Sequence, residues 1–223
     1  MSDTHIVTVH EIIPRTHNVN TFRVTKPENF SFAPGQATDL SLNKEGWKDN
    51  KHPFTFTSLP ADGYLEFTIK MYDNPAGLTH QLKSVHAGDE FEISDAWGAI
   101  EYKGEGVFIA GGAGVTPFIS IFRDLKQKNQ IGNNQLIFSN KTEDDIILKA
   151  EFENMLGNNF INVITSQPAT KYYNKRIDTH YLESTIKNFS QHFYVCGPDE
   201  FTKNILAALE RLGASAETLV FEK

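Results

Sequence analysis

Apolar residues recur in short runs through the first hundred positions, and turns that contain proline, glycine or aspartate separate these runs. This pattern predicts short β-strands and is typical of an antiparallel barrel or sandwich. One helical insertion is expected at Ala76–Ser84. The expected strands are Ile6–Ile13, Val19–Val24, Gln36–Leu42, Pro53–Ser58, Tyr64–Met71, Phe91–Ile93 and Gly98–Tyr102.

The rest of the chain alternates apolar runs with amphipathic segments, which predicts a parallel sheet with helices on both faces. The turn Lys103–Gly106 separates the two patterns, so we expect two domains, 1–103 and 104–223. The expected strands are Val107–Ala110, Leu136–Ser139, Ile161–Ser166, Phe193–Cys196 and Leu219–Phe221, and the expected helices are Pro117–Gln127, Asp145–Leu156, His180–Lys187 and Pro198–Leu212.

Composition and charge exclude several classes of function. The formal net charge of -7 argues against a nucleic-acid partner. The single cysteine, Cys196, cannot form an internal disulfide or a cysteine-ligated metal site, so no metal is expected, and it fits a reducing cytoplasm. No stretch approaches the about 18 apolar residues of a membrane span, and the N-terminal segment lacks the apolar core of a signal peptide. We therefore expect a cytoplasmic protein with no membrane insertion.

The sequence GGAGVTP follows one expected strand and precedes a helix. Gly111, Gly112 and Gly114 would allow close approach to a ligand and positive φ angles. Thr116 is expected as the N-cap, with Pro117 at the first helical position. Free N–H groups at such a helix start make an anion site, for which a pyrophosphate is the natural guest. A tight turn without a ligand explains the same residues.

Two further segments could bind an elongated ligand. Cys196, Gly197 and Pro198 end a second strand of the same sheet, so their loop is expected beside GGAGVTP. Gly77 and Thr79 resemble a helix start in the first domain, which predicts a second anion site. Taken alone, each of these segments could be an ordinary turn.

The motifs together resemble the ferredoxin–NADP reductase superfamily, and the likeness covers essentially the whole chain. It implies an FAD-binding β-barrel domain at 1–103, followed by a Rossmann-like NAD(P)-binding α/β domain at 104–223. The motifs appear, in the family's order, as Phe32–Gln36, His52–Thr55, Gly77–Leu82, Gly111–Pro117 and Cys196–Pro198.

The resemblance implies roles for the FAD-binding residues. Phe54 takes the position that packs on the isoalloxazine ring, and Thr55 the position whose hydroxyl reaches flavin N5. His52 replaces the family's arginine, which predicts weaker and pH-sensitive flavin retention because histidine is only partly charged near neutral pH. Phe54 replaces a tyrosine, and Phe221 is the only candidate for the aromatic residue that covers the second flavin face in relatives, so that face is expected to be open. The other FAD-binding residues implied are Pro53, Ile69, Lys70, Met71, Gly77, Leu78 and Thr79.

The resemblance also implies that GGAGVTP binds the NAD(P)H pyrophosphate and that Cys196 lies near nicotinamide C4. Thr55 and Cys196 are therefore the predicted catalytic residues, and Gly197 and Pro198 complete the nucleotide site. Lys141 and Arg176 are candidates for a 2′-phosphate, which favours NADPH, whereas Asn140 could bond a free hydroxyl, so NADH stays open.

These features predict a flavoprotein oxidoreductase that takes a hydride from NAD(P)H to FAD and passes electrons to a separate acceptor. Ferredoxin, flavodoxin or an oxygenase component are the expected acceptors, and a local patch of Arg15, Arg23 and Lys26 could receive one. Two alternatives remain. One is a reductase of free flavin or ferric chelates, and the other is a flavin-binding electron-transfer module that does not use NAD(P)H.

Overall fold

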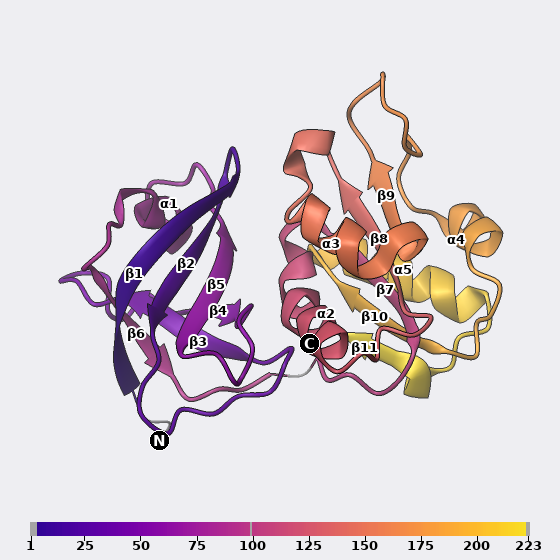
Figure 1. Cartoon of the computed structure of the whole chain (residues 1–223). Coiled ribbons are helices and arrows are strands. Elements are labelled where there is room, and N and C mark those ends of the chain that lie inside the picture. Colours follow the sequence, from indigo (N-terminus) through magenta and orange to yellow (C-terminus); the bar gives the residue numbers. More distant parts are fainter. Residues whose placement is uncertain (1–3, 99, 222–223) are drawn as a thin grey trace.

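The computed structural model describes residues 4–98 and 100–221, which form an antiparallel sheet and a parallel sheet side by side (Figure 1). The antiparallel sheet has six strands in the order β4-β3-β6-β1-β2-β5. It curls into a nearly closed barrel, because Phe56, just after β4, bridges Phe67 of β5. The strands are β1 (Thr4–Thr16), β2 (Val19–Thr25), β3 (Ala37–Leu42), β4 (His52–Thr55), β5 (Tyr64–Lys70) and β6 (Glu90–Ser94).

The barrel core is built from side chains that alternate inward along the strands. Phe22, Phe67 and Phe91 are fully buried there. The helical insertion consists of two short pieces, α1 (Leu78–Gln81) and a 3₁₀ turn at Leu82–Ser84.

The predicted strand at Gly98–Tyr102 is wrong for its described residues, and Ala99 lies outside them. The chain instead makes one antiparallel bridge, with mutual backbone hydrogen bonds of 2.6 and 2.7 Å between Ala37 and Trp97. Gly98 then adopts a φ of +124°, which turns the chain out of the strand direction.

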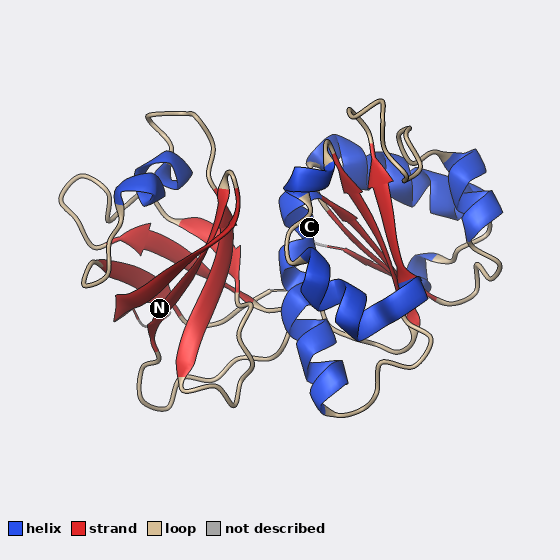
Figure 2. Ribbon diagram, turned by 45° about the horizontal axis from the view of Figure 1, so that its top comes forward, coloured by secondary structure: helices blue, strands red, loops and turns tan. Residues whose placement is uncertain are grey.

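The parallel sheet has five strands in the order β11-β10-β7-β8-β9, with helices on both faces (Figure 2). Phe108 and Ala110 pack with α2 and α3, whereas Val107 and Ile109 pack with α4 and α5. The strands are β7 (Gly106–Gly111), β8 (Gln135–Asn140), β9 (Phe160–Ile164), β10 (His192–Cys196) and β11 (Leu219–Phe221), and the helices are α2 (Thr116–Gln127), α3 (Lys149–Leu156), α4 (Thr179–Thr185) and α5 (Asp199–Arg211).

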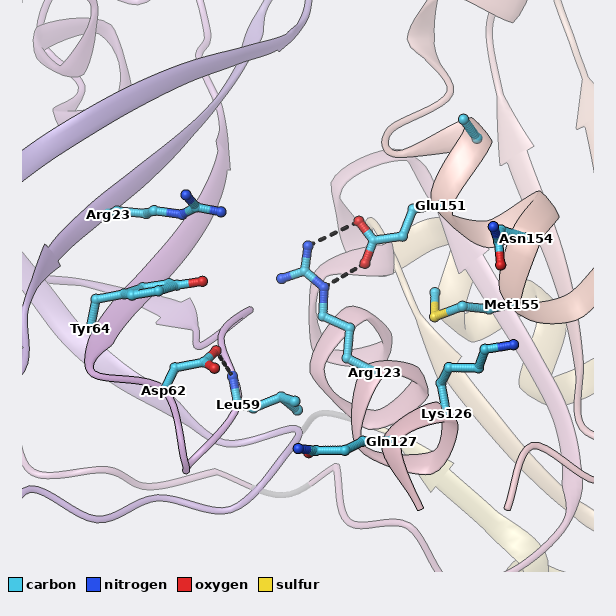
Figure 3. Close-up of a pocket in the computed structure, with 11 residues that line it drawn as sticks. Arg23, Leu59, Asp62, Tyr64, Arg123, Lys126, Gln127, Glu151, Asn154 and Met155 are labelled. Atoms are coloured by element: carbon cyan, nitrogen blue, oxygen red, sulfur yellow. Dashed lines mark hydrogen bonds and ion pairs between the residues drawn. The ribbon is translucent and has the colours of Figure 1, made fainter. Parts of the chain in front are cut away.

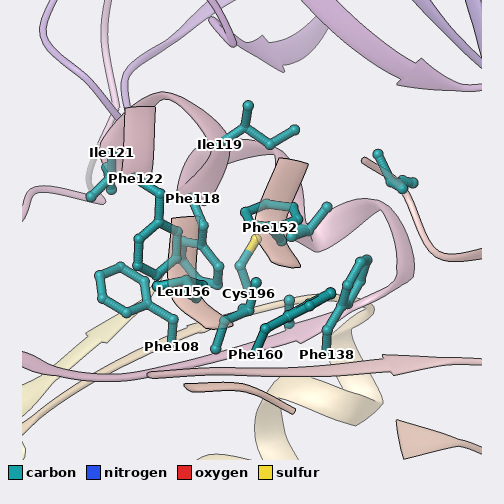
Figure 4. Packing of buried hydrophobic residues seen from close by; sticks show 14 of the residues in the cluster. Phe108, Phe118, Ile119, Ile121, Phe122, Phe138, Phe152, Leu156, Phe160 and Cys196 are labelled. Atoms are coloured by element: carbon teal, nitrogen blue, oxygen red, sulfur yellow. The ribbon is translucent and has the colours of Figure 1, made fainter. Parts of the chain in front are cut away.

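One face of this sheet carries a cluster of aromatic rings (Figure 4). Phe108 stacks on Tyr194 with 4.1 Å between ring centroids and lies 4.5 Å from the ring of Phe122 on α2. The Tyr194 hydroxyl donates to the carbonyl of Gly104 and accepts from the N–H groups of Lys103 and Gly104. The cluster therefore anchors the connection between the sheets, while the exact domain boundary after Lys103 stays a prediction.

The starts of α4 and α5 lie within one residue of the prediction, whereas those of α2 and α3 differ in their caps. The N-cap of α2 is Val115, and Thr116 has helical dihedral angles, because a 3₁₀ turn at Gly112–Val115 runs directly into the helix. The helix α3 begins at Lys149, four residues after the predicted start at Asp145. Asp145 instead closes a capping box with Thr142 around a separate 3₁₀ turn.

Candidate functional site

The strand β4 presents the predicted flavin motif at the end of the sheet order. His52 and Pro53 are exposed, and Phe54 and Thr55 are half-buried, with Phe54 packed against the barrel core. The His52 ring is hydrogen-bonded to Asn50 Oδ1 at 2.8 Å. The Thr55 hydroxyl has no hydrogen-bond partner among the described residues. This edge therefore offers an accessible aromatic face beside a free hydroxyl.

The predicted FAD-binding residues at the end of β5 and in α1 differ in how far their side chains are exposed. The side chains of Ile69 and Leu78 are buried in the barrel core, so only their backbone can reach a ligand. Lys70 is half-buried, and the sulfur of Met71 accepts a long hydrogen bond of 3.8 Å from Asn20 Nδ2.

The helix α1 begins next to unsatisfied polar groups. Gly77 is its N-cap with an extended backbone (φ −93°). Thr79 is half-buried without a hydrogen bond from its hydroxyl, and the buried Nδ1 atom of His80 has no partner among the described residues. Buried polar atoms are rarely left unpaired, so this turn fits a polar ligand such as a diphosphate. Because α1 has only four residues, these groups rather than a helix dipole supply the attraction.

The three glycines of GGAGVTP differ in backbone conformation and in the space around them. Gly112 alone has a positive φ, +53°, and open space where a side chain would project. Gly111 is extended, and a Cβ on it would lie 3.0 Å from the Phe201 ring. A Cβ on Gly114 would lie 2.5 Å from the carbonyl carbon of Cys196. The prediction of positive φ is therefore wrong for Gly111 and Gly114, which are small because protein atoms pack against them.

The two strand-end loops meet as the sequence predicts. Cys196 lies in register with Ala110 on the neighbouring strand β7. A Cβ on Gly197 would lie 2.6 Å from the Phe201 ring, which therefore covers both Gly111 and Gly197. The Cys196 side chain is 8% exposed and belongs to the aromatic cluster (Figure 4). Pro117 is buried at the second position of α2.

A cavity of about 240 Å³ lies beside these loops, at the carboxyl ends of β8, β9 and β10. Of the predicted residues, Arg176 and Pro198 line it, whereas Lys141 is exposed and does not. The buried Nδ2 atom of Asn140, at the end of β8, has no hydrogen-bond partner among the described residues. The lining residues are Ser139, Thr165, Arg176, Ile177, Pro198, Glu200, Phe201, Asn204 and Ile205.

Sequence reasoning missed Glu200 and Phe201 in this cavity. Their signal was their position on the first turn of α5, two and three residues after Pro198, at a strand end that the sequence had already marked. Phe221 packs against the core on the α4 and α5 side of the sheet, as part of β11.

A larger cavity of about 710 Å³ lies between the barrel and the helices α2 and α3 (Figure 3). None of the predicted cofactor residues lines it. Next to it, Glu66 is 1% exposed and bonded to Arg123. Burial alone would raise the pKa of Glu66, but the charge and hydrogen bonds of Arg123, with further hydrogen bonds from Arg23 and Thr57, outweigh burial and lower that pKa. The charges of Glu66 and Arg123 are therefore already paired with each other.

The barrel has an aromatic edge and a turn with a polar atom unpaired among the described residues, and the parallel sheet has glycine loops at its carboxyl edge; together these features define a class of protein. This class is the oxidoreductases that bind a flavin and a nicotinamide dinucleotide. Two family models match the chain: "FAD-binding domain" over residues 5–124 and "Oxidoreductase NAD-binding domain" over residues 108–206. The chain therefore belongs to the ferredoxin–NADP reductase-like family of FAD- and NAD(P)H-dependent oxidoreductases.

Curated relatives are similar to this chain in sequence. NADH–cytochrome b5 reductase 1 of Arabidopsis thaliana is 28% identical, with 91% of this chain and 78% of the relative aligned. The reductase component of the naphthalene 1,2-dioxygenase system of Pseudomonas putida is 22% identical, with 94% and 66% aligned. The chain spans about half, 46%, of NADH–cytochrome b5 reductase 2 of Mycosarcoma maydis, to which it is 31% identical over 66% of its own length.

A solved structure shows the same fold. The ferredoxin NADP⁺ reductase of Neisseria gonorrhoeae, solved with bound FAD and NADP, superposes with a TM-score of 0.86 over 100% of this chain and 99% of that chain, at 17% identity. No helix in the described part of the chain is both long and apolar enough to span a membrane.

Proposed function

We propose that this chain transfers electrons from NADH through FAD to a separate acceptor protein. The observation that carries the proposal is the meeting of the GGAGVTP loop with the Cys196–Gly197 backbone, next to the cavity that contains Arg176. This arrangement lies at the carboxyl edge of the sheet, where parallel sheets bind nucleotides.

The barrel residues would hold FAD. Phe54 offers its ring as a packing surface and Thr55 its free hydroxyl as a hydrogen-bond donor. Thr79 and His80 offer unsatisfied polar atoms to the diphosphate. When bound, FAD supplies the conversion between two-electron and one-electron chemistry. The chain's own contribution is to bind, orient and shield the reacting groups.

The cavity residues favour NADH over NADPH. Arg176 is the one cation among the cavity-lining residues, and Glu200 also lines it. A 2′-phosphate carries nearly two negative charges, so a neighbouring carboxylate opposes it. Lys141, the second predicted phosphate ligand, is exposed and outside the lining. The buried Asn140 amide, the residue that could bond a free ribose hydroxyl, also lies outside the lining, so Glu200 is what separates the two donors.

The acceptor is a protein electron carrier in this proposal. The relatives include a cytochrome b5 reductase and a reductase component of a dioxygenase system, which supports a carrier such as a cytochrome b5, a ferredoxin or an oxygenase component. Flavodoxin remains a candidate from the sequence.

An anaerobic titration of the purified protein tests this function. The flavin absorbance band should bleach at a lower concentration of NADH than of NADPH. A bound flavin that neither nucleotide bleaches would leave the fold intact and make the chain an electron-transfer module that does not use NAD(P)H.

One observation favours reduction of free flavin or ferric chelates as a second candidate. His52 stands at the position of the family's arginine and is exposed, with its ring bonded to Asn50, so FAD lacks the permanent charge that an arginine would supply there. If FAD is a substrate, turnover should saturate with added FAD, and His52→Arg should convert the protein to one that retains FAD through gel filtration. If wild type already retains FAD and added FAD does not change turnover, this candidate is wrong.

A further inference from the structure

The helix α2 (Thr116–Gln127) is bonded to both halves of the proposed site. Its first turn continues the GGAGVTP loop. One turn further along, the Ser120 hydroxyl accepts the N–H of Gly35 from the barrel at 3.0 Å. Three residues later, Arg123 Nη1 donates to the backbone carbonyl of Thr57 at 2.6 Å. Residues three apart share a helix face, so one face of α2 contacts the barrel at two points.

Arg123 is the centre of a chain of alternating charges, of which Figure 3 shows the pair with Glu151. Its Nε and Nη2 atoms bind the two oxygens of Glu151 on α3 at 2.5 and 3.0 Å. Its Nη1 atom binds Glu66 Oε1 on β5 at 2.6 Å. Glu66 Oε2 accepts from Arg23 Nε at 3.0 Å, and Arg23 Nη1 donates to Glu11 at 2.9 Å. The Arg123 guanidinium is thus bonded to carboxylates on both sides of the interface, Glu151 on α3 and Glu66 on β5.

Thr57 connects this chain to the flavin strand. Its N–H donates to the Glu66 carbonyl at 2.7 Å, its hydroxyl donates to Glu66 Oε1 at 2.9 Å, and its carbonyl accepts from Arg123. Thr57 lies two residues after Thr55, a distance of about 7 Å along an extended chain. Arg123 lies seven residues after Thr116, about 10 Å along the helix. Two short, rigid segments therefore join the proposed flavin and nucleotide contacts at Arg123.

Side-chain packing does not fill this part of the interface. The cavity of about 710 Å³ separates Arg23 and Tyr64 of the barrel from Lys126 and Met155 of the helices (Figure 3). Apolar contacts could slide where they are incomplete, whereas a guanidinium fork accepts only a narrow range of geometries. The ion pairs of Arg123 are therefore the contacts with the strictest geometry on this side of the interface.

We propose that Arg123 is a positioning residue for hydride transfer, which sets the distance between the nucleotide loop and the flavin strand through Thr57 and Glu66. The inference rests on the proposed placement of FAD along β4 and of NADH at the GGAGVTP loop. Replacing a buried ion pair by neutral residues is often nearly neutral for stability, so the expected loss is in geometry. A misplacement of about 1 Å costs about a hundredfold in rate.

The test compares two variants with a matched control. The double variant Arg123→Met/Glu66→Gln removes both charges and leaves no unpaired buried carboxylate. Arg123→Lys keeps the charge and loses the fork. Lys128→Met, at the C-cap of the same helix, breaks only the exposed pair with Asp124, at 2.7 Å. For each protein, FAD content, NAD⁺ affinity and the limiting rate of flavin reduction by NADH are measured anaerobically.

We expect the double variant to lose about tenfold to a hundredfold in limiting rate, with FAD content and NAD⁺ affinity within about threefold of wild type. The limiting rate of Arg123→Lys should lie between those of the double variant and wild type, and the limiting rate of Lys128→Met should match that of wild type. If the double variant does not fold, Arg123→Lys decides alone. A limiting rate within about twofold of wild type in each folded variant overturns the inference, as does a rate loss matched by lost FAD or NAD⁺ binding. A wild-type protein that binds FAD and is not reduced by NADH overturns the proposed function as well, and that result is visible before any variant is made.

Discussion

Gly114→Ala should separate the two loops that form the nucleotide site. The added Cβ would lie 2.5 Å from both the Cys196 carbonyl carbon and the Gly197 nitrogen. This is about 0.9 Å short of the 3.4 Å at which ordinary contact begins, and both neighbours are backbone atoms that cannot rotate away. One of the two loops must therefore move by most of an ångström.

This displacement should lower both the stability of the protein and its affinity for NAD⁺. Overpacking of this kind destabilises a protein by about 1–3 kcal/mol. At about 2–4 °C per kcal/mol for a chain of this size, the midpoint of thermal unfolding should fall by several degrees. Since both loops belong to the proposed nucleotide site, NAD⁺ affinity should also fall whichever loop moves, by about tenfold or more.

Thermal unfolding and an NAD⁺ titration of Gly114→Ala check both effects. Gly63→Ala is the matched control, because Gly63 has no positive φ and no atom within 4 Å of an added Cβ. Its unfolding midpoint should stay within about 2 °C of wild type. If Gly114→Ala unfolds at the wild-type temperature and binds NAD⁺ with wild-type affinity, the loops do not pack as described and the reasoning is refuted.

Three further variants test other parts of the structure. The pKa of Glu66 is lowered from its ordinary value of 4.5, because the charge and hydrogen bonds of Arg123 outweigh the effect of burial. The ionised Glu66 therefore contributes its full stabilisation above pH 4.5, and this contribution is lost as the pH falls through the lowered pKa. Glu66→Gln should accordingly flatten the acid side of a plot of urea-unfolding free energy against pH. Tyr194→Phe removes the hydroxyl that donates to the Gly104 carbonyl, and urea unfolding should show a loss of about 1–3 kcal/mol. Glu200→Gln should raise kcat/KM for NADPH relative to NADH by about threefold to tenfold, and an unchanged ratio would exclude Glu200 as a determinant of donor choice.

Local pattern predicted most elements of the fold. The apolar run Val107–Ala110 marked a strand of a sheet with helices on both faces, and the structure confirms that its residues face two helix layers in turn. Errors arose where a distant residue decided the local conformation. The bridge between Trp97 and Ala37 joins positions 60 residues apart. The sequence at Gly98–Tyr102 therefore could not indicate where the chain pairs and where it leaves the strand direction.

For the candidate site, as for the fold, the sequence predicted the location of the elements but not the contacts between distant segments. The glycine motifs located both loops, because strand ends and helix starts have short-range signatures. The reason for each glycine could not be predicted, since the Phe201 ring that covers Gly111 and Gly197 comes from a different segment. Lys141 and Arg176 were equal candidates in the sequence, and only the folded cavity separates them.

By itself the sequence determined the succession of strands and helices, the change from antiparallel to parallel organisation and the place of the nucleotide loops, because hydrophobic period and turn residues act over a few positions. Only the tertiary structure decided which charges meet. Arg123 binds Glu66, 57 positions away, and Glu151, 28 positions away, across the interface between the two sheets. Such pairing depends on how separate segments pack in three dimensions, and no spacing along the chain encodes it.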